Sequence, residues 1–409
     1  MALGFMAGYF VIAFVLVPLF YRMQLVSIYG YLEQRFGAGA YRTGAWIFFI
    51  SKLLGSSVRL FMICVVLQLL VFEPCGLPFW LNAFVAVLLV LLYTFQGGVK
   101  SLIWTDTLKT ICLLLSIALS IWFVVKQLDM SFVEMVQTVK SSEKSRIFFF
   151  DDINDRRFFF KQFLAGLFTV IAMTGLDQDM MQRSLSCKNY RDSQKNLVVS
   201  TFLQTIVIFI LLVLGVILYT FAERMGITLP AGTDNMFPTV ATSPTMPIVV
   251  GVLFILGLVS STYSSAGSAL TALTTSFTID VLSGAKRFDD EQLTKVRKGV
   301  HIAMAIAMFV VICILHHLGR SSVIDAVYTL ASYTYGPILG LFAFGIFTKW
   351  SVRGRYVGIV AVVAPILCFI LQQNSERWFG GYKFSYELLL VNALITFIGL
   401  LMLVKRENR

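Results

Sequence analysis

Apolar segments long enough to cross a lipid bilayer recur along almost the whole chain, and this pattern is typical of polytopic membrane proteins. Only 13% of the residues are charged and the mean hydropathy is +0.82, which excludes an ordinary soluble domain. We therefore expect an all-α membrane protein that forms a single polytopic domain over residues 1–409. The sequence predicts eleven spans, over residues 3–20, 43–72, 79–96, 102–125, 158–177, 197–222, 247–282, 299–316, 322–347, 356–372 and 385–404.

Lys and Arg are concentrated in alternate loops, and this distribution predicts the orientation. The segments 183–195 and 286–298 and the C-terminal end are rich in basic residues, whereas the intervening loops are poor in them. The positive-inside rule therefore places the C-terminus in the cytoplasm, with residues 127–157 as an extracytoplasmic loop. The net charge of +11 follows this topology, so we expect a multi-pass protein of the plasma (bacterial inner) membrane that binds no nucleic acid.

The predicted position of Met1 is unusual for the first span of a membrane protein. Counting back eleven spans from a cytoplasmic C-terminus places Met1 outside, yet no positive region or cleavage site precedes the first apolar run. A helix that enters from outside normally follows an earlier helix, so we expect one or more spans upstream of Met1. The six Cys contain no CxxC pair and the three His are badly spaced, which argues against a disulfide framework or a zinc enzyme.

The segment Gly257–Asp280 carries a stripe of hydroxyl residues inside a long apolar run. Ser261, Ser264, Ser265 and Ser268 follow the spacing i, i+3, i+4, i+7 and share one face of a helix. Small residues of this kind often form packing seams between membrane helices. Hydroxyl oxygens are also the ligands that hard cations prefer. The stripe alone favours the packing seam.

Arg59 and Asp106 are charged candidates in or beside apolar runs. Arg59 falls near the middle of the span 43–72, where a guanidinium must face the protein interior or a cavity. It either pairs with a buried carboxylate such as Asp106 or clamps a carboxylate of a solute with its planar fork. Asp106 lies in the first turn of a helix, where an acid favours the helix dipole, and it is equally a candidate functional acid.

Further polar residues and helix breaks mark candidate gates. Asp177, Gln178, Asp179 and Arg183 end the fifth span and form either an inner gate or an interfacial ion-pair cluster, and the cluster is favoured. Tyr333 and Tyr335 flank the pair Gly336–Pro337 and suggest a gate, although aromatic core packing is favoured for each residue alone. Breaks are expected at Gly97–Gly98, Gly175 and Gly336–Pro337, because broken helices in membranes line cavities or binding sites.

Five segments in order resemble the sodium:solute symporter family, and the resemblance covers essentially the whole chain. They are Ser27–Gly37 (SIYGYLEQRFG), Gly97–Lys109 (GGVKSLIWTDTLK), Thr174–Asn196 (TGLDQDMMQRSLSCKNYRDSQKN), Ser264–Asp280 (SSAGSALTALTTSFTID) and Tyr328–Lys349 (YTLASYTYGPILGLFAFGIFTK). The resemblance implies a LeuT-type five-plus-five inverted-repeat helix bundle. The span 3–20 matches the second core helix and 322–347 the tenth, so the first core helix has no counterpart in this sequence.

The resemblance also implies sodium ligands. In the family, the main sodium site uses two adjacent hydroxyl residues and a nearby carbonyl of the eighth core helix, which correspond to Ser264, Ser265 and the carbonyl of Ser261. With this match, the ion-site interpretation of the stripe overtakes packing. A second sodium site of some members resembles Asp106, Ser264, Ser268 and position 267. Gly267 has no side chain where relatives use Ser or Asp, so this site lacks one ligand.

The resemblance finally implies a function. Sialic-acid transporters of the family carry an Arg at a place that matches Arg59, which makes an anionic solute the expected substrate. We expect a secondary transporter, not an enzyme, that moves a small organic solute with Na⁺ as the coupling ion and needs no cofactor. The alternative is a truncated, non-transporting or sensor-like homologue of the same family.

Overall fold

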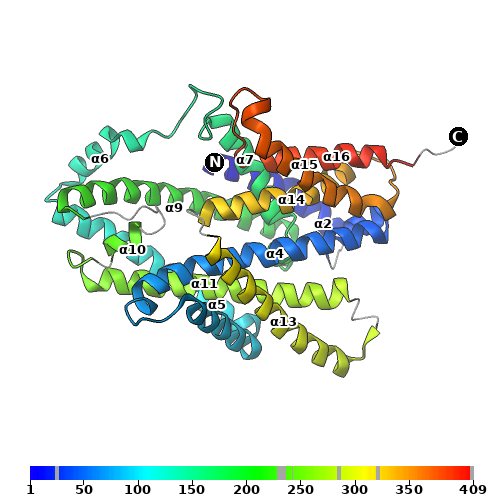
Figure 1. Ribbon diagram of the computed structural model, residues 1–409, viewed down its shortest axis with the longest axis horizontal. Coiled ribbons are helices and arrows are strands. Elements are labelled where there is room, and N and C mark those ends of the chain that lie inside the picture. The colour runs from blue at the N-terminus through cyan, green and yellow to red at the C-terminus, as the bar shows by residue number, and fades with distance from the viewer. Residues whose placement is uncertain (24–26, 228–235, 242, 283–286, 319–322, 406–409) are drawn as a thin grey trace.

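The computed structural model is all-helical in the part of the chain that it describes (Figure 1). It describes residues 1–23, 27–227, 236–241, 243–282, 287–318 and 323–405, without the side chains of 96–106, 108, 109, 262, 323, 324 and 326. The α-helices are α1 (Ala2–Val11), α2 (Val17–Met23), α3 (Gly30–Phe36), α4 (Ala38–Leu67), α5 (Phe79–Gln127), α6 (Phe132–Ser141), α7 (Phe159–Val170), α8 (Gln178–Leu185), α9 (Tyr190–Met225), α10 (Met236–Ala241), α11 (Ile248–Ser276), α13 (Asp290–His317), α14 (Val323–Phe347), α15 (Val357–Trp378) and α16 (Leu388–Met402).

Short π-helical and 3₁₀ segments join or extend these helices. The π-helical segments are η1 (Ile12–Leu16), η2 (Gln68–Phe72), η4 (Ile171–Gly175) and η6 (Phe277–Val281), and the 3₁₀ segments are η3 (Glu143–Ser145) and η7 (Gly354–Tyr356). Single π-turns inside helices often mark functional positions. Here η4 ends shortly before Asp177, the residue at which the chain changes direction.

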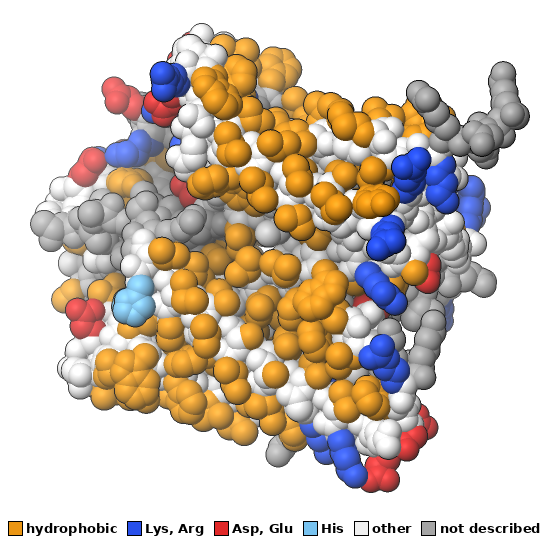
Figure 2. All heavy atoms as spheres, turned by 45° about the vertical axis from the view of Figure 1, so that its right-hand side comes forward, with side chains coloured by type: hydrophobic (Ala, Val, Ile, Leu, Met, Phe, Trp, Pro, Cys, Tyr) orange, Lys and Arg blue, Asp and Glu red, His pale blue; other side chains and the backbone are white. Residues whose placement is uncertain are grey.

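The helices reproduce the predicted spans. Among the described residues, eight helices are long and apolar enough to cross a membrane, or nine with the bent pair Phe159–Gly175 and Gln178–Leu185. Two shorter apolar helices, Phe79–Phe95 and Leu388–Met402, fall on the two remaining predicted spans. Figure 2 shows apolar side chains forming a broad band on one face, with Lys and Arg gathered along one edge. Such a surface is suited to lipid, and the protein is an integral membrane protein with many spans.

The three expected helix breaks have different outcomes. The break at Gly175 is confirmed, since the two halves of the bent pair meet at 70°. The break at Gly97–Gly98 falls within α5, which is helical over Phe79–Gln127 and carries two of the predicted spans. The side chains at 96–106 lie outside the described part of the chain, and the predicted break there stays a prediction.

The expected break at Gly336–Pro337 is wrong, and the structure shows what keeps α14 continuous. Pro337 cannot donate to the carbonyl of Tyr333, four residues before it. The amide of Asn392 on α16 donates to that carbonyl at 3.0 Å and to the carbonyl of Ser332 at 2.9 Å. Gly336 leaves room for this approach. A side chain from a neighbouring helix thus replaces the missing backbone hydrogen bond.

The segment 127–157, which the sequence predicts as a loop, contains helix α6. Ser131 caps this helix by accepting from the Glu134 backbone, and the Glu134 carboxylate accepts from the Ser131 backbone. This reciprocal capping box satisfies two backbone donors at the start of a short helix. The segment is therefore partly ordered by its own local contacts.

Helix α4 is the element that positions the site, because it belongs to two hydrophobic cores. Phe48 lies in a core with α3 and α14, while Leu60 and Ile63 lie in a second core with α5, α11 and α13. In Figure 1, α4 lies between α14 and α11, and it packs against both. Polar side chains on the remaining face of α4 therefore meet α14 and the bend at Asp177.

Candidate functional site

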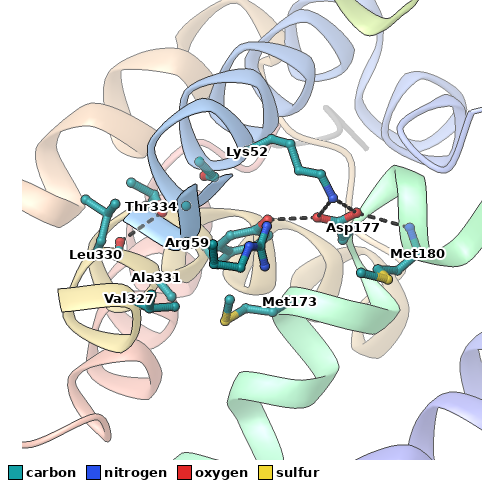
Figure 3. A pocket seen from close by; sticks show the side chains of 12 residues that line it. Lys52, Arg59, Met173, Asp177, Met180, Val327, Leu330, Ala331 and Thr334 are labelled. Atoms are coloured by element: carbon teal, nitrogen blue, oxygen red, sulfur yellow. Dashed lines mark hydrogen bonds and ion pairs between the residues drawn. The ribbon is translucent and has the colours of Figure 1, made fainter. Parts of the chain in front are cut away.

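A small cavity lies against one face of α4 (Figure 3). Lys52, Gly55 and Arg59 follow the spacing i, i+3, i+7 and so line it from one side of the helix. Its volume is about 20 Å³, which is room for about one water molecule. The other residues that line it come from α4, the η4–α8 bend and α14: Ser51, Met173, Asp177, Met180, Val327, Leu330, Ala331, Thr334 and Tyr335.

Arg59 reaches this cavity without an ion-pair partner in the described part of the chain. Its Nε atom is fully buried and has no hydrogen-bond partner there. A buried polar group of this kind is costly unless something satisfies it. The expected rival partner, Asp106, lies outside the described side chains, so the predicted pairing of the two stays a prediction. The prediction that Arg59 faces the interior or a cavity is confirmed.

Lys52 lies seven residues before Arg59, on the same face of α4, but two carboxylates surround its charge. Its Nζ atom lies 3.1 Å and 3.2 Å from the two carboxylate oxygens of Asp177 and 3.0 Å from Oδ2 of Asp179. Lys52 is only 3% exposed, and a buried ammonium group needs such partners. Lys52 is therefore paired, whereas Arg59 has no ion-pair partner among the described residues.

Asp177 is the centre of this polar cluster, which we call the Lys52 cluster and define as Lys52, Asp177, Asp179, Arg183, Ser268 and Tyr335. The Asp177 carboxylate caps α8 by accepting from the backbone N–H of Met180 at 3.1 Å. It also accepts from the hydroxyl of Tyr335 on α14 at 2.9 Å. Figure 3 shows Lys52 and Met180 converging on this carboxylate. Asp177 therefore ties α4, α8 and α14 together at one point.

Asp179 connects the same cluster to the hydroxyl stripe on α11. The Ser268 hydroxyl donates to the Asp179 carboxylate, at 3.3 Å from each oxygen. Arg183 contacts both residues, with its Nε 3.5 Å from Oδ1 of Asp179 and its guanidinium hydrogen-bonded to Ser268. The residues at 177–183 thus form an ion-pair cluster, as predicted. Its centre is buried, since Asp177 is 2% exposed, whereas the sequence favours an interfacial position.

The stripe residues predicted to bind sodium lie on one helix, α11, which packs against α4 and α5. Ser264 is buried, and Ser261 and Ser265 are partly buried. Ser268 lies beside Asp179, although the family resemblance pairs it with Asp106. A Cβ atom at position 267 would lie 2.9 Å from the Thr94 side chain, so the glycine there also permits close helix packing.

Sequence reasoning missed Lys52, although a signal for it exists. Lys52 lies inside the predicted span 43–72, seven residues before Arg59, and an intramembrane charge on the same face is visible in the sequence. Its partners lie 125 and 127 residues further along the chain, and no spacing rule reaches over that distance. The sequence marks Tyr335 as a gate candidate, and its bond to Asp177 shows that it does more than pack.

Polar contacts join four elements of the structure at this place. Ion pairs and hydroxyl contacts join α4, the η4–α8 bend, α11 and α14 beside a cavity that contains the guanidinium of Arg59. Bent helices, buried charges and a cavity between helices are typical of the binding site of a membrane transporter.

Comparison with known proteins identifies the class and then the family. The chain is similar to a solved Na⁺-coupled sialic acid symporter in a substrate-bound outward-open state, with a TM-score of 0.75 and 20% identity over 99% of this chain and 85% of that one. The fold is therefore the LeuT-type helix bundle. The model of the sodium:solute symporter family matches residues 1–360, and the chain belongs to this family.

Curated relatives agree with this assignment. The sodium/sialic acid symporter SiaT of Proteus mirabilis is 25% identical over 92% of this chain and 76% of its own length. The sodium/sialic acid symporter NanT of Aliivibrio fischeri is 25% identical over 89% of this chain and 72% of its own length. The human sodium/iodide cotransporter is 23% identical over 92% of this chain and 59% of its own length. The protein is a sodium-coupled solute transporter, and Na⁺ is its coupling ion.

Proposed function

We propose that the protein moves a small anionic solute together with sodium, and that Arg59 binds the anionic group. The observation that carries the proposal is the buried Nε of Arg59, which has no partner in the described part of the chain and faces a cavity. A planar guanidinium offers paired N–H donors that match a carboxylate. A carboxylate of the solute would satisfy the Nε group, which has no partner among the described side chains.

The charge balance around the cavity supports an anion. Among the described side chains, three cations lie at or beside the cavity, namely Lys52, Arg59 and Arg183, and two anions, Asp177 and Asp179. Since Lys52 and Arg183 contact the carboxylates, the excess positive charge falls on Arg59. Binding of a monoanion would neutralise the site, and a low-dielectric interior favours neutral sites.

The relatives named above are consistent with this charge. Their names specify sialic acid and iodide, and a third type of relative, the bovine sodium-coupled monocarboxylate transporter 2, is 25% identical over 84% of this chain and 56% of its own length. All three solutes are anions. We take a sugar acid such as sialic acid as the first solute to test.

For sodium, we propose a main site formed by the hydroxyls of Ser264 and Ser265 and the carbonyl of Ser261. Hydroxyl and carbonyl oxygens suit a hard cation, and the three residues share one face of α11. A second sodium at Asp106 and Ser268 would require Ser268 to leave Asp179 and Arg183, which it contacts in this structure.

We further propose that the Lys52 cluster is an inner gate. The cavity of about 20 Å³ is too small for a sugar acid, so the helices around it must separate to admit one. The ion pairs of Lys52 join α4 to the bend at Asp177, and Tyr335 joins that bend to α14. Breaking and reforming these contacts would open and close one side of the solute site.

Substitution of Arg59 tests the function most simply. We expect sialic acid, added to purified protein in detergent with sodium, to raise the melting temperature of the wild type. The methyl ester of sialic acid lacks the negative charge and should not raise the melting temperature. Arg59→Lys keeps the charge but loses the planar fork, and should weaken solute binding about tenfold or more, which is roughly 1.4 kcal/mol. Stabilisation by the acid in Arg59→Ala would remove Arg59 from the binding site.

We also propose an orientation of the protein in the membrane. The C-terminus would lie in the cytoplasm, the segment 127–157 would lie outside, and residues 1–409 would act as one domain in the plasma membrane. The basic edge in Figure 2 and the alternation of charged loops support this orientation. In a variant whose six native cysteines are replaced by serine, a cysteine placed at Lys405 should react only with membrane-permeant thiol reagents in intact cells. Labelling of this cysteine by an impermeant reagent would reverse the orientation.

A further inference from the structure

A second, larger cavity lies apart from the Arg59 site and shares no lining residue with it. Its volume is about 360 Å³, within the range of roughly 300–1,000 Å³ that is common for small-molecule sites. It lies between α5, α11 and α13, which pack against one another. The residues that line it are Thr94, Phe95, Thr271, Thr274, Thr294, Arg297, Lys298 and His301.

The α13 side of this cavity is a cationic face. Thr294, Arg297, Lys298 and His301 follow the spacing i, i+3, i+4, i+7 and so share one side of the helix. Within the described residues, neither Arg297 nor Lys298 forms an ion pair, and no carboxylate lines the cavity. The Glu291 carboxylate is paired instead with Lys295, at 2.7 Å. The cavity therefore presents positive charge that its own lining does not balance.

The base of the cavity is held in place by a buried histidine. His301 is 8% exposed, and its ring nitrogens each lie 2.8 Å from a threonine hydroxyl, Nε2 from Thr94 and Nδ1 from Thr274. The imidazole on α13 thus connects α5 and α11. Both hydroxyls also lie within hydrogen-bond distance of carbonyls of their own helices, so the polar base is fixed before any ligand arrives.

The surroundings of the cavity are those of a lipid-facing surface. Phe95, which lines it, is 47% exposed, and Ile302 and Ile306 continue along α13 with 44% and 58% exposure. The cationic residues of the cavity lie in the first half of α13, before the apolar part of this helix. A cationic pocket lined with hydroxyls and followed by exposed apolar side chains matches a phospholipid better than it matches a free ion.

We propose that this cavity binds the phosphate group of an anionic phospholipid, with the acyl chains along Ile302 and Ile306. Arg297 and Lys298 would neutralise the phosphate and donate charge-assisted hydrogen bonds to its oxygens. The site is separate from the solute site, so lipid binding can be measured without transport. It would make the packing of α13 against α5 and α11 depend on the lipid.

The test compares two variants that remove the same number of positive charges. Arg297→Gln with Lys298→Gln removes the cations of the cavity, and Arg353→Gln with Arg355→Gln removes two basic residues outside it. Phosphatidylglycerol and phosphatidylcholine are titrated into each purified protein in detergent, and bound lipid is counted by native mass spectrometry. We expect phosphatidylglycerol, but not phosphatidylcholine, to bind the wild type and the control. The cavity variant should bind it roughly thirtyfold more weakly.

Three outcomes would overturn the proposal. The first is unchanged phosphatidylglycerol binding in the cavity variant. The second is an equal loss in the Arg353 and Arg355 control, which would indicate a general effect of charge. The third is displacement of bound phosphatidylglycerol by an equal concentration of inorganic phosphate, which would assign the site to a free anion. Melting temperatures without added lipid check that both variants are folded.

Discussion

Lys52 and Arg59 lie on one face of one helix, yet their surroundings give them different roles. Lys52 is satisfied by Asp177 and Asp179, whereas the Nε of Arg59 has no partner in the described part of the chain. Arg59 could be recognised from the sequence, because a guanidinium deep in an apolar run demands an explanation. The role of Lys52 could not, because it depends on a bend 125 residues away.

The ion pairs of Lys52 predict strong coupling between stability and charge. Lys52→Met should lower the melting temperature in detergent, because it leaves the buried carboxylate of Asp177 without its cation, a loss of about 3–5 kcal/mol. Lys52→Met combined with Asp177→Asn should recover part of that loss, and Lys52→Arg should retain most of the stability. If Lys52→Met melts like the wild type, the Lys52 cluster holds no helices together.

The hydroxyl pair on α11 gives a second prediction at this scale. Ser264→Ala and Ser265→Ala each remove one proposed oxygen ligand without lowering helix propensity. The sodium concentration for half-maximal thermal stabilisation should rise several-fold in each variant, while the yield of folded protein stays unchanged. Thr275→Ala, which removes an exposed hydroxyl further along the same helix, is the control. Unaltered sodium dependence in both serine variants would leave the stripe as a packing seam.

Among the elements, α14 shows why local patterns misjudge helix breaks. The pair Gly336–Pro337 predicts an interruption, but the Asn392 amide on α16 bonds the carbonyl that Pro337 leaves free. Gly175 does mark a bend, because the chain there leaves η4 and starts α8 at the Asp177 cap. The difference lies in neighbouring helices that are remote in sequence, so residue type alone could not decide it.

The contact between α14 and α16 can be tested with matched glycine substitutions. A Cβ atom at Gly336 would lie 2.5 Å from Cβ and Cγ of Asn392, so Gly336→Ala should destabilise the protein by about 1–3 kcal/mol. Gly215→Ala on α9 meets no heavy atom within 4 Å and should be neutral or stabilising by up to about 1 kcal/mol. Thermal unfolding in detergent measures both. Equal effects would mean that the seam at Asn392 is loosely packed.

For the whole molecule, the number and position of the spans could be predicted because bilayer thickness sets the length of an apolar helix. The LeuT-type arrangement could not be worked out from span lengths and came from the five family segments. The candidate site was predicted only in part, since Arg59 and the α11 stripe are visible in the sequence but the Lys52 cluster requires the tertiary contacts. The cavity at Arg297 has no signal in the sequence beyond four polar residues on one helical face.

The most direct test of the account is solute uptake into proteoliposomes that contain the purified protein. Radiolabelled sialic acid and a small monocarboxylate are supplied under an inward sodium gradient and, in parallel, under an equal inward potassium gradient. We expect at least one anionic solute to accumulate above its outside concentration only with sodium, and Arg59→Ala to abolish this accumulation. Equal uptake under the two gradients, or sodium-driven accumulation that survives in Arg59→Ala, would contradict sodium-coupled transport of an anion bound by Arg59.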